Sequence, residues 1–319
     1  MNKFRYYFIL IITTLSLFSC SKDDNAIEQV PLRDYGEQFT ADNITIEEYL
    51  NTYTFEVINA PGETRDQDIN FTKIPAGGTA RSIMSYLDST TFPKLLSKEV
   101  ELHDIKYKLY YLVLREGVGE SPCNVDGVLT SYRGQYLSKN TVDEVTTLTP
   151  TQFEEIKYPQ SFFNLYEVVT GWSEVFPEFK TGGIPTEVGD GTVINNDFGA
   201  GVMFLPSGLG YYAGNGRIPA YTPLIFSFKL YAINRLDFDN DGILSYLEDI
   251  NGDGNVYNDD TDGDGKPDFN DPDDDGDGFL TRREITVNGK LIPFDLIPDC
   301  SGNTTDPDRK KKYLDKNCH

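Results

Sequence analysis

A run of acidic residues between positions 237 and 284 limits most strongly what this chain can fold into. The run holds fifteen Asp and two Glu against one Lys and two Arg, so it carries −14 of the net charge of −23 in the 319-residue chain. Carboxylates at this density repel one another, and such a segment stays open unless its charge is neutralised. The run is therefore either a disordered acidic spacer or a set of loops that close around cations.

The order of residues within the run favours cations. Residues 237–248 and 273–284 each place side-chain oxygens at alternate positions, a glycine at the sixth position and a glutamate at the twelfth, as the EF-hand calcium loop does. Two further acidic loops lie between them with little room for helices, so the array resembles the thrombospondin type 3 repeat more than paired EF-hands. The resemblance implies a loop-rich module over residues 235–319 that Ca²⁺ orders permanently. Its expected metal ligands are Asp237, Asp239, Asp241, Glu248, Asp249, Asn251, Asp253, Asp260, Asp262, Asp264, Asp268, Asp271, Asp273, Asp275, Asp277 and Glu284.

The first residues have the composition of an export signal. Lys3 and Arg5 precede an apolar run that is too short to cross a bilayer, so residues 1–19 are expected to be a signal peptide. The run ends in Leu17-Phe18-Ser19-Cys20, which resembles the bacterial lipobox. The resemblance implies that Cys20 is acylated and anchors the chain to a membrane through a tether over residues 20–34. An ordinary signal peptide in which Cys20 is incidental is the alternative.

The polar residues that follow, 21–24, are similar to the tag that sends Bacteroidetes lipoproteins to the outside of the outer membrane. We therefore expect an outer-membrane lipoprotein on the periplasmic face or the cell surface. The acidic balance excludes a nucleic-acid partner, and two histidines leave almost nothing for imidazole catalysis or zinc. Cys300 and Cys318 are able to close a loop in an oxidising compartment, and Cys123 is expected to be unpaired and buried.

The residue pattern in the middle of the chain predicts a sheet with helices. Strand-forming residues dominate 106–115, 128–132 and 224–233, which predicts an antiparallel sheet. A short helix over 171–179 would place four apolar residues on one face, and a second helix is expected over 36–53. The plain role of this second helix is packing against the next domain. Residues 61–104 predict no clear element. The four apolar residues of the short helix are Trp172, Val175, Phe176 and Phe179.

Five segments of this region, taken in order, resemble an FKBP-type peptidyl-prolyl isomerase domain over residues 105–234. They are residues 114–119, 128–134, 168–172, 205–211, and 218–219 with 224–226. Some bacterial relatives of this family are lipoproteins, including ones associated with gliding motility. The resemblance implies an α+β fold in which an antiparallel half-barrel sheet wraps one short helix, preceded by a helical and irregular region over 35–104. In exported prolyl isomerases a leading helix also joins two protomers, so the resemblance adds a homodimer as the alternative role of the helix over 36–53.

The resemblance also implies an aromatic pocket that binds proline-containing client polypeptides. Rotation about a prolyl peptide bond faces a barrier of about 18–20 kcal/mol, and a dry pocket that favours the twisted amide lowers it without a nucleophile or cofactor. Trp172 would form the floor, Tyr132, Phe226 and either Phe162 or Phe163 the walls, and Val168 and Ile218 the rim. The Val169 N–H and the Tyr211 hydroxyl would bind the flanking carbonyl groups. Asp143 would face the twisting carbonyl, although the family has phenylalanine before this acid and this chain has Val142.

Three other interpretations compete with an active isomerase. The aromatic residues are simply the core of a sheet-and-helix domain, as aromatic stripes usually are. A surface binding or chaperone module keeps the pocket but not the turnover. In the third, the calcium array is an adhesive element and the FKBP fold is its scaffold. An insertion over 183–201, where the family has a short link, either overhangs the pocket or has no role.

Overall fold

The computed structural model describes residues 31–189 and 193–318. From Asp34 onward the chain forms one compact unit. The expected signal peptide and Cys20 lie outside the described residues. Among the described residues, no helix combines the length and the hydropathy that a membrane span needs.

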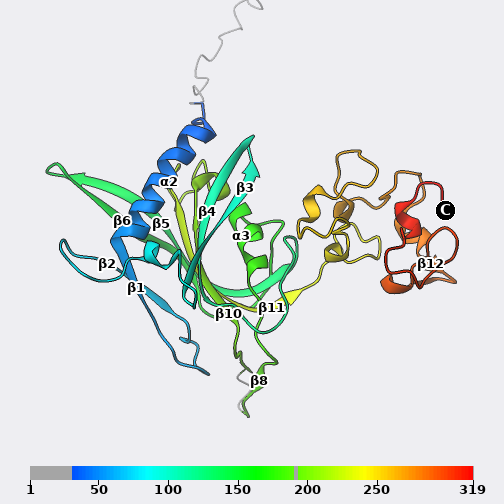
Figure 1. Ribbon diagram of the computed structural model, residues 1–319, viewed down its shortest axis with the longest axis horizontal. Coiled ribbons are helices and arrows are strands. Elements are labelled where there is room, and N and C mark those ends of the chain that lie inside the picture. The colour runs from blue at the N-terminus through cyan, green and yellow to red at the C-terminus, as the bar shows by residue number, and fades with distance from the viewer. Residues whose placement is uncertain (1–30, 190–192, 319) are drawn as a thin grey trace, which may run out of the picture. The chain divides into compact units, whose positions relative to one another are not determined.

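A curled antiparallel sheet of seven strands forms the body of the protein, in the order β3-β4-β10-β11-β5-β6 with β7 paired to β5. Figure 1 shows the sheet curving around helix α3, which spans Thr170–Val175 and continues as a 3₁₀ turn over Phe176–Glu178. The expected α+β half-barrel on one short helix is thus present. The strands are β3 (Lys94–Leu102), β4 (Ile105–Arg115), β5 (Gly127–Val142), β6 (Val145–Ile156), β7 (Phe163–Asn164), β10 (Gly199–Leu205) and β11 (Leu224–Asn234).

Both faces of this sheet are buried, because successive side chains of a strand point to opposite faces. Strand β10 is buried along its whole length, with Met203 and Leu205 facing the α3 side and Val202 and Phe204 facing the other. The α3 side holds the larger apolar core, which includes all four apolar residues expected on this helix. The sheet therefore separates two cores.

Helix α2 (Tyr35–Thr52) covers the second core. Asp34 caps its N-terminus, since its carboxylate accepts a hydrogen bond 2.9 Å long from the Glu37 N–H. Ile46, Tyr49 and Leu50 are fully buried against the sheet of the same chain. The helix thus packs on the next domain, as one alternative expected, and its role in joining two protomers stays a prediction.

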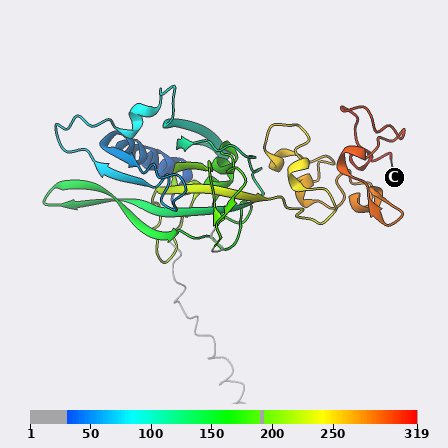
Figure 2. The same cartoon turned by 90° about the horizontal axis from the view of Figure 1, so that it is seen from below.

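Two strands lie in the region 61–104, where the sequence predicted no element, and a third lies just before it. Strands β1 (Tyr53–Val57) and β2 (Ile69–Lys73) form a hairpin, and β3 pairs with β4 at the edge of the main sheet. The sheet therefore begins at position 94, so the expected domain start at 105 falls inside the β3–β4 hairpin. The β5–β6 hairpin is also longer than the expected strand over 128–132, and Figure 2 shows its tip reaching beyond the sheet.

The C-terminal part consists of short turns that follow acidic loops, as expected for a loop-rich module. The glycines at the sixth position of two loops, Gly242 and Gly278, have φ of 104° and 90°, a region that other residues avoid. Cys300 and Cys318 form a disulfide with Cα atoms 5.4 Å apart, and Cys123 is free and half-buried. The elements are 3₁₀ turns η4 (Ser245–Leu247), η5 (Val256–Asn258), η6 (Asp268–Asn270), η7 (Phe294–Leu296) and η8 (Lys312–Leu314), helix α4 (Thr281–Glu284), and strands β12 (Thr286–Val287) and β13 (Lys290–Leu291).

Candidate functional site

Four aromatic side chains that were expected to form a pocket lie together on the α3 side of the sheet. The Trp172 ring is at the centre, with ring centroids 4.9 Å from Tyr132, 5.4 Å from Phe226 and 5.7 Å from Phe163. The planes of these three pairs cross at 82°, 89° and 70°, the edge-to-face geometry that aromatic quadrupoles favour. Of Phe162 and Phe163, between which the sequence did not decide, Phe163 is therefore the one that packs in the cluster. Phe162 is more exposed and makes none of the described ring contacts.

The fold brings these rings together from four elements. Tyr132 lies on β5 and Phe226 on the adjacent β11, opposite Gly134. A side chain at Gly134 would collide with the ring of Phe153, and the glycine thus lets Phe153 pack edge-on against Phe226 with centroids 5.7 Å apart. Phe163 comes from the short strand β7. Val168 and Val169 follow it half-buried, and Val169 is the residue before α3.

Polar groups line an open depression next to this cluster. The Tyr132 hydroxyl donates a hydrogen bond 2.6 Å long to the Glu154 carboxylate. Burial raises the pKa of Tyr211, and the negative charge of Glu154 raises it further. Among the described hydrogen bonds, none uses the Val169 N–H as a donor. The depression measures about 450 Å³, and an adjoining one contains Ile218. The depression of about 450 Å³ is lined by Phe153, Glu154, Tyr211, Asn215, Gly216 and Arg217.

Asp143 does not belong to this site, so that expectation was wrong. Asp143 and Glu144 form the exposed turn of the β5–β6 hairpin, with φ of 50° and 65°. The acid beside the rings is Glu154, and the residue before it is Phe153. A phenylalanine before an acid, which the resemblance led us to expect, is therefore present further along the chain. That pair was the sequence signal that could have identified the acid.

A β-bulge explains how both members of this pair reach the same site. Glu154 is opposite Gly134 and Gln152 is opposite Gln135, so Phe153 is the extra residue of β6. A bulge redirects a side chain that regular alternation would send to the other face. Phe153 therefore packs on Phe226 while Glu154 reaches Tyr132.

The floor of the cluster is nearly closed. Trp172 is only 4% exposed, and it does not line the cavities described here. Its indole Nε1 is buried without a hydrogen-bond partner among the described residues. The rings thus continue directly into the core, and a proline ring reaches the indole from the depression only if wall side chains move. The described residues of the 183–201 insertion, including strands β8 (Thr186–Glu187) and β9 (Val193–Ile194), do not line these cavities.

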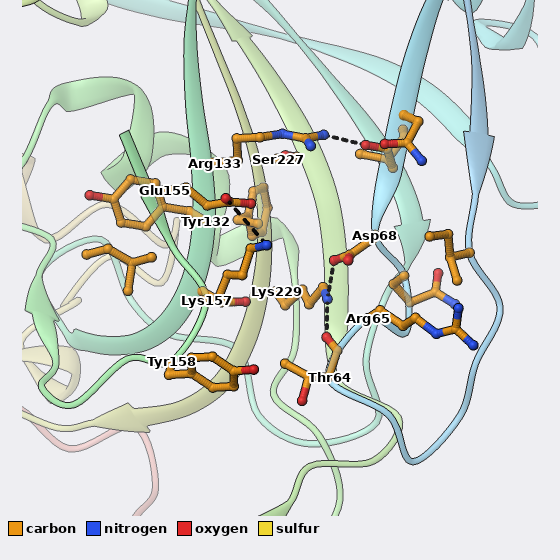
Figure 3. Close-up of a pocket in the computed structure, with 17 residues that line it drawn as sticks. Thr64, Arg65, Asp68, Tyr132, Arg133, Glu155, Lys157, Tyr158, Ser227 and Lys229 are labelled. Atoms are coloured by element: carbon orange, nitrogen blue, oxygen red, sulfur yellow. Dashed lines mark hydrogen bonds and ion pairs between the residues drawn. The ribbon is translucent and has the colours of Figure 1, made fainter. Parts of the chain in front are cut away.

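A different cavity, of about 370 Å³, lies against the opposite face of the sheet (Figure 3). Tyr132 is the one expected site residue in its lining, and Figure 3 shows the Tyr132 ring pointing away from Lys229 and Arg133. Lys229 forms an ion pair 2.6 Å long with Asp68, and Arg133 donates a hydrogen bond to the Ile69 carbonyl. Since its lining contains only one of the expected site residues, this cavity is not the expected site.

The acidic module contains a second candidate site, built from carboxylates. Asp239, Asp241, Glu248 and Asp274 each offer an oxygen, and these oxygens lie within 4.8 Å of one another. The first three belong to one expected loop, whereas Asp274 comes from the last loop and was not expected. Asp274 and Glu248 are 1% and 0% exposed, and both oxygens of each lack a hydrogen-bond partner among the described residues.

Electrostatics make this cluster unfavourable as it stands. Burial raises the pKa of Glu248 to about 11 and that of Asp274 to about 10, and neighbouring carboxylates add to both shifts. Burial raises the pKa of Asp239 to about 8 and that of Asp241 to about 7 in the same way. Buried charges of one sign require a counter-charge, so a set of oxygen ligands like this fits a hard divalent cation.

Other expected ligands divide into two groups. Two further sets of carboxylates gather, Asp260 with Asp262 and Asp264, and Asp273 with Asp275 and Asp277. Glu284 is buried near the second set, with a pKa raised to about 8 by burial and by the charge of Asp275. The rest were expected to converge but do not form such a set among the described residues. Asp237, Asp249, Asn251 and Asp253 accept main-chain N–H bonds within their own loops, Asp268 binds Thr261, and Asp271 pairs with Lys266.

Comparison with known proteins gives matches to the two parts separately. Residues 238–307 match the family model described as BamM C-terminal, which is not a model of calcium repeats. A peptidyl-prolyl cis-trans isomerase from Pseudomonas syringae pv. tomato is similar at 16% identity and a TM-score of 0.33, over 65% of this chain and 100% of that chain. FkpA from Escherichia coli is similar at 26% identity and a TM-score of 0.28, over 40% of this chain and 48% of FkpA, about half its length. No curated protein matches the sequence.

Proposed function

We propose that this protein is a peptidyl-prolyl cis-trans isomerase of the FKBP type that acts on exported or surface polypeptides. The observation that carries the proposal is the edge-to-face cluster of Tyr132, Trp172 and Phe226 beside a depression that contains the Tyr211 side chain. The matches to solved isomerases have low TM-scores and do not support the proposal.

The site would act through binding alone. A proline ring held between aromatic rings leaves water, and the twisted peptide bond, which has lost its resonance, is then favoured over both planar forms. The Val169 N–H and the Tyr211 hydroxyl would donate hydrogen bonds to the carbonyl groups on either side of the proline. Glu154 takes the place expected of Asp143, next to the twisting carbonyl, where the hydrogen bond from Tyr132 holds it. No covalent bond to the protein is formed.

A protease-free assay with a proline-containing peptide tests this proposal. Uncatalysed isomerisation takes tens to hundreds of seconds, so acceleration is easily seen. Trp172→Ala and Phe226→Ala should remove most of it. Phe198→Ala is the matched control, because this phenylalanine is 3% exposed but packs in the core on the other side of the sheet.

No acceleration by the folded wild-type protein would reject an isomerase. The binding or chaperone module then becomes the better account. It requires that client binding survive Glu154→Gln and Tyr211→Phe.

A specific observation favours a second role, structural Ca²⁺ binding by the acidic module. Asp239, Asp241, Glu248 and Asp274 would be ligands, since their buried oxygens lack partners among the described residues. Six to eight oxygens at flexible positions suit Ca²⁺ better than the smaller Mg²⁺, and extracellular modules bind it at about 10⁻⁴–10⁻³ M. Calorimetric titration should show binding that Asp274→Asn weakens and that the exposed Asp295→Asn does not change. Binding that is equal in both variants would contradict this role.

We place the protein at the outer membrane as a lipoprotein anchored through Cys20. The support is the lipobox-like sequence at 17–20, which lies outside the described residues. Mass spectrometry of the native protein should find a mature N-terminus at Cys20 that carries acyl chains. An unmodified N-terminus at another residue would contradict the anchor.

A further inference from the structure

One tyrosine connects the acidic module to the segment that carries part of the aromatic site. The ring of Tyr166 packs against Phe238, Phe269 and Tyr257, with centroids 5.2, 5.5 and 6.2 Å away. Tyr166 lies between Phe163, a wall of the site, and Val169, the expected N–H donor. Because Tyr166 is three residues from each of them, a displacement of Tyr166 is expected to displace Phe163 and Val169 as well.

Each of the three contacting rings is attached to an acidic loop. Phe238 stands between Asp237 and Asp239 at the start of the first loop. Tyr257 lies in η5, where the Asn255 side chain accepts a hydrogen bond from its N–H, and Phe269 lies in η6. Phe269 is almost fully buried in a small core with Val125. The positions of these rings thus depend on how the acidic loops are folded.

The same module also contacts helix α3. Burial raises the pKa of Tyr257 to about 12, while a side-chain hydrogen bond with Ser173 acts in the opposite direction. Ser173 follows Trp172, the floor of the site. The loop before β5 joins this contact, since the Asn124 amide donates a hydrogen bond 2.8 Å long to Asn255. The acidic module therefore contacts the wall segment and the loop before β5, and Tyr257 lies close to the helix that carries the floor.

We propose that Tyr166 is a positioning residue through which cation binding in the acidic module sets the shape of the aromatic site. This inference rests on the proposed functions of both parts. With cations bound, the acidic loops fold and hold Phe238, Tyr257 and Phe269 around Tyr166, which fixes the segment 163–169. Without them, carboxylates repel one another, the three rings separate, and this segment loses its support.

The single tryptophan of the chain makes the proposal testable without measuring catalysis. Trp172 is the floor of the site, so tryptophan emission reports on it alone. Calcium added to the chelator-treated wild-type protein should shift this emission and raise kcat/KM together. Tyr166→Ala should bind calcium with wild-type affinity by calorimetry but lose both responses. Tyr166→Phe should restore both, because it keeps the ring.

A matched variant and the calorimetry separate the possible failures. Tyr158→Ala removes an exposed tyrosine that makes none of the described contacts with the module, so its response should stay at the wild-type level. A wild-type response in Tyr166→Ala, or no emission response although calcium binds, overturns the proposal. No calcium binding overturns the metal role and this inference together. An emission response without isomerisation rejects the enzyme and leaves the coupling in place.

Discussion

The Glu154 carboxylate is fixed by one hydrogen bond from Tyr132 and by the bulge at Phe153. We expect Glu154→Gln to lower kcat/KM roughly tenfold with little change in stability, since one hydrogen bond to a charged group contributes about 1.5 kcal/mol. The amide keeps the shape and an acceptor, so the loss reports on the charge. Asp143→Asn is the control, because this aspartate lies in an exposed turn, and it should leave kcat/KM unchanged. The reverse pattern would restore Asp143 as the acid.

The sequence located the rings better than the acid for a physical reason. Trp172, Tyr132 and Phe226 stand in short segments whose spacing is fixed by one helix turn or one strand. The acid stands beyond a hairpin of variable length, and a bulge shifts its register by one residue. Asp274 was missed for a similar reason, since it joins ligands that lie 26 or more residues earlier in the chain. Neither position follows from local spacing.

Elements with a clear apolar period were predictable, and elements at edges were not. Helix α2, strands β4 and β11 and helix α3 lie close to the expected ranges. Strand β3 was missed because its sequence KLLSKEVEL mixes four charged residues into the alternation, as an edge strand that borders solvent permits. Strands β1 and β2 were missed because they form their hairpin on the second core, which the sequence did not reveal.

Helix α2 should contribute stability without affecting the aromatic site. Tyr49 is fully buried on this helix and its ring stacks on Tyr53 with centroids 4.1 Å apart. Tyr49→Ala should cost about 3–5 kcal/mol in the free energy of unfolding, measured by denaturant titration, and leave kcat/KM of the folded protein unchanged. Tyr49→Phe is the matched control. Its hydroxyl is buried without a partner among the described residues, so removing it should be neutral or stabilising. A loss of stability in Tyr49→Phe as large as that in Tyr49→Ala would contradict this expectation.

The molecule as a whole joins a sheet domain with apolar cores to a module that carries most of the net negative charge. Where the two meet, Asp126 is fully buried and pairs with Arg235 at the end of β11. Removing one partner of a buried pair leaves an uncompensated charge. The junction is thus built from buried contacts rather than from a flexible linker, which is why a change in the acidic module reaches the sheet domain.

Limited proteolysis should separate these two parts by their dependence on cations. Arg282 and Arg283 are exposed in α4 at the end of the last acidic loop, so trypsin reaches them once the loop opens. We expect fast cleavage there in EDTA and slow cleavage in Ca²⁺, because −14 charges in 48 residues repel one another without a counter-ion. Sodium chloride at 1 M should slow the EDTA reaction partly, since it shortens the screening length to about 3 Å.

Cleavage after Arg33, outside the module, is the internal control and should not respond to calcium. Equal cleavage at Arg282 with and without calcium would show that the module folds without metal. Calcium could then not change the aromatic site through Tyr166.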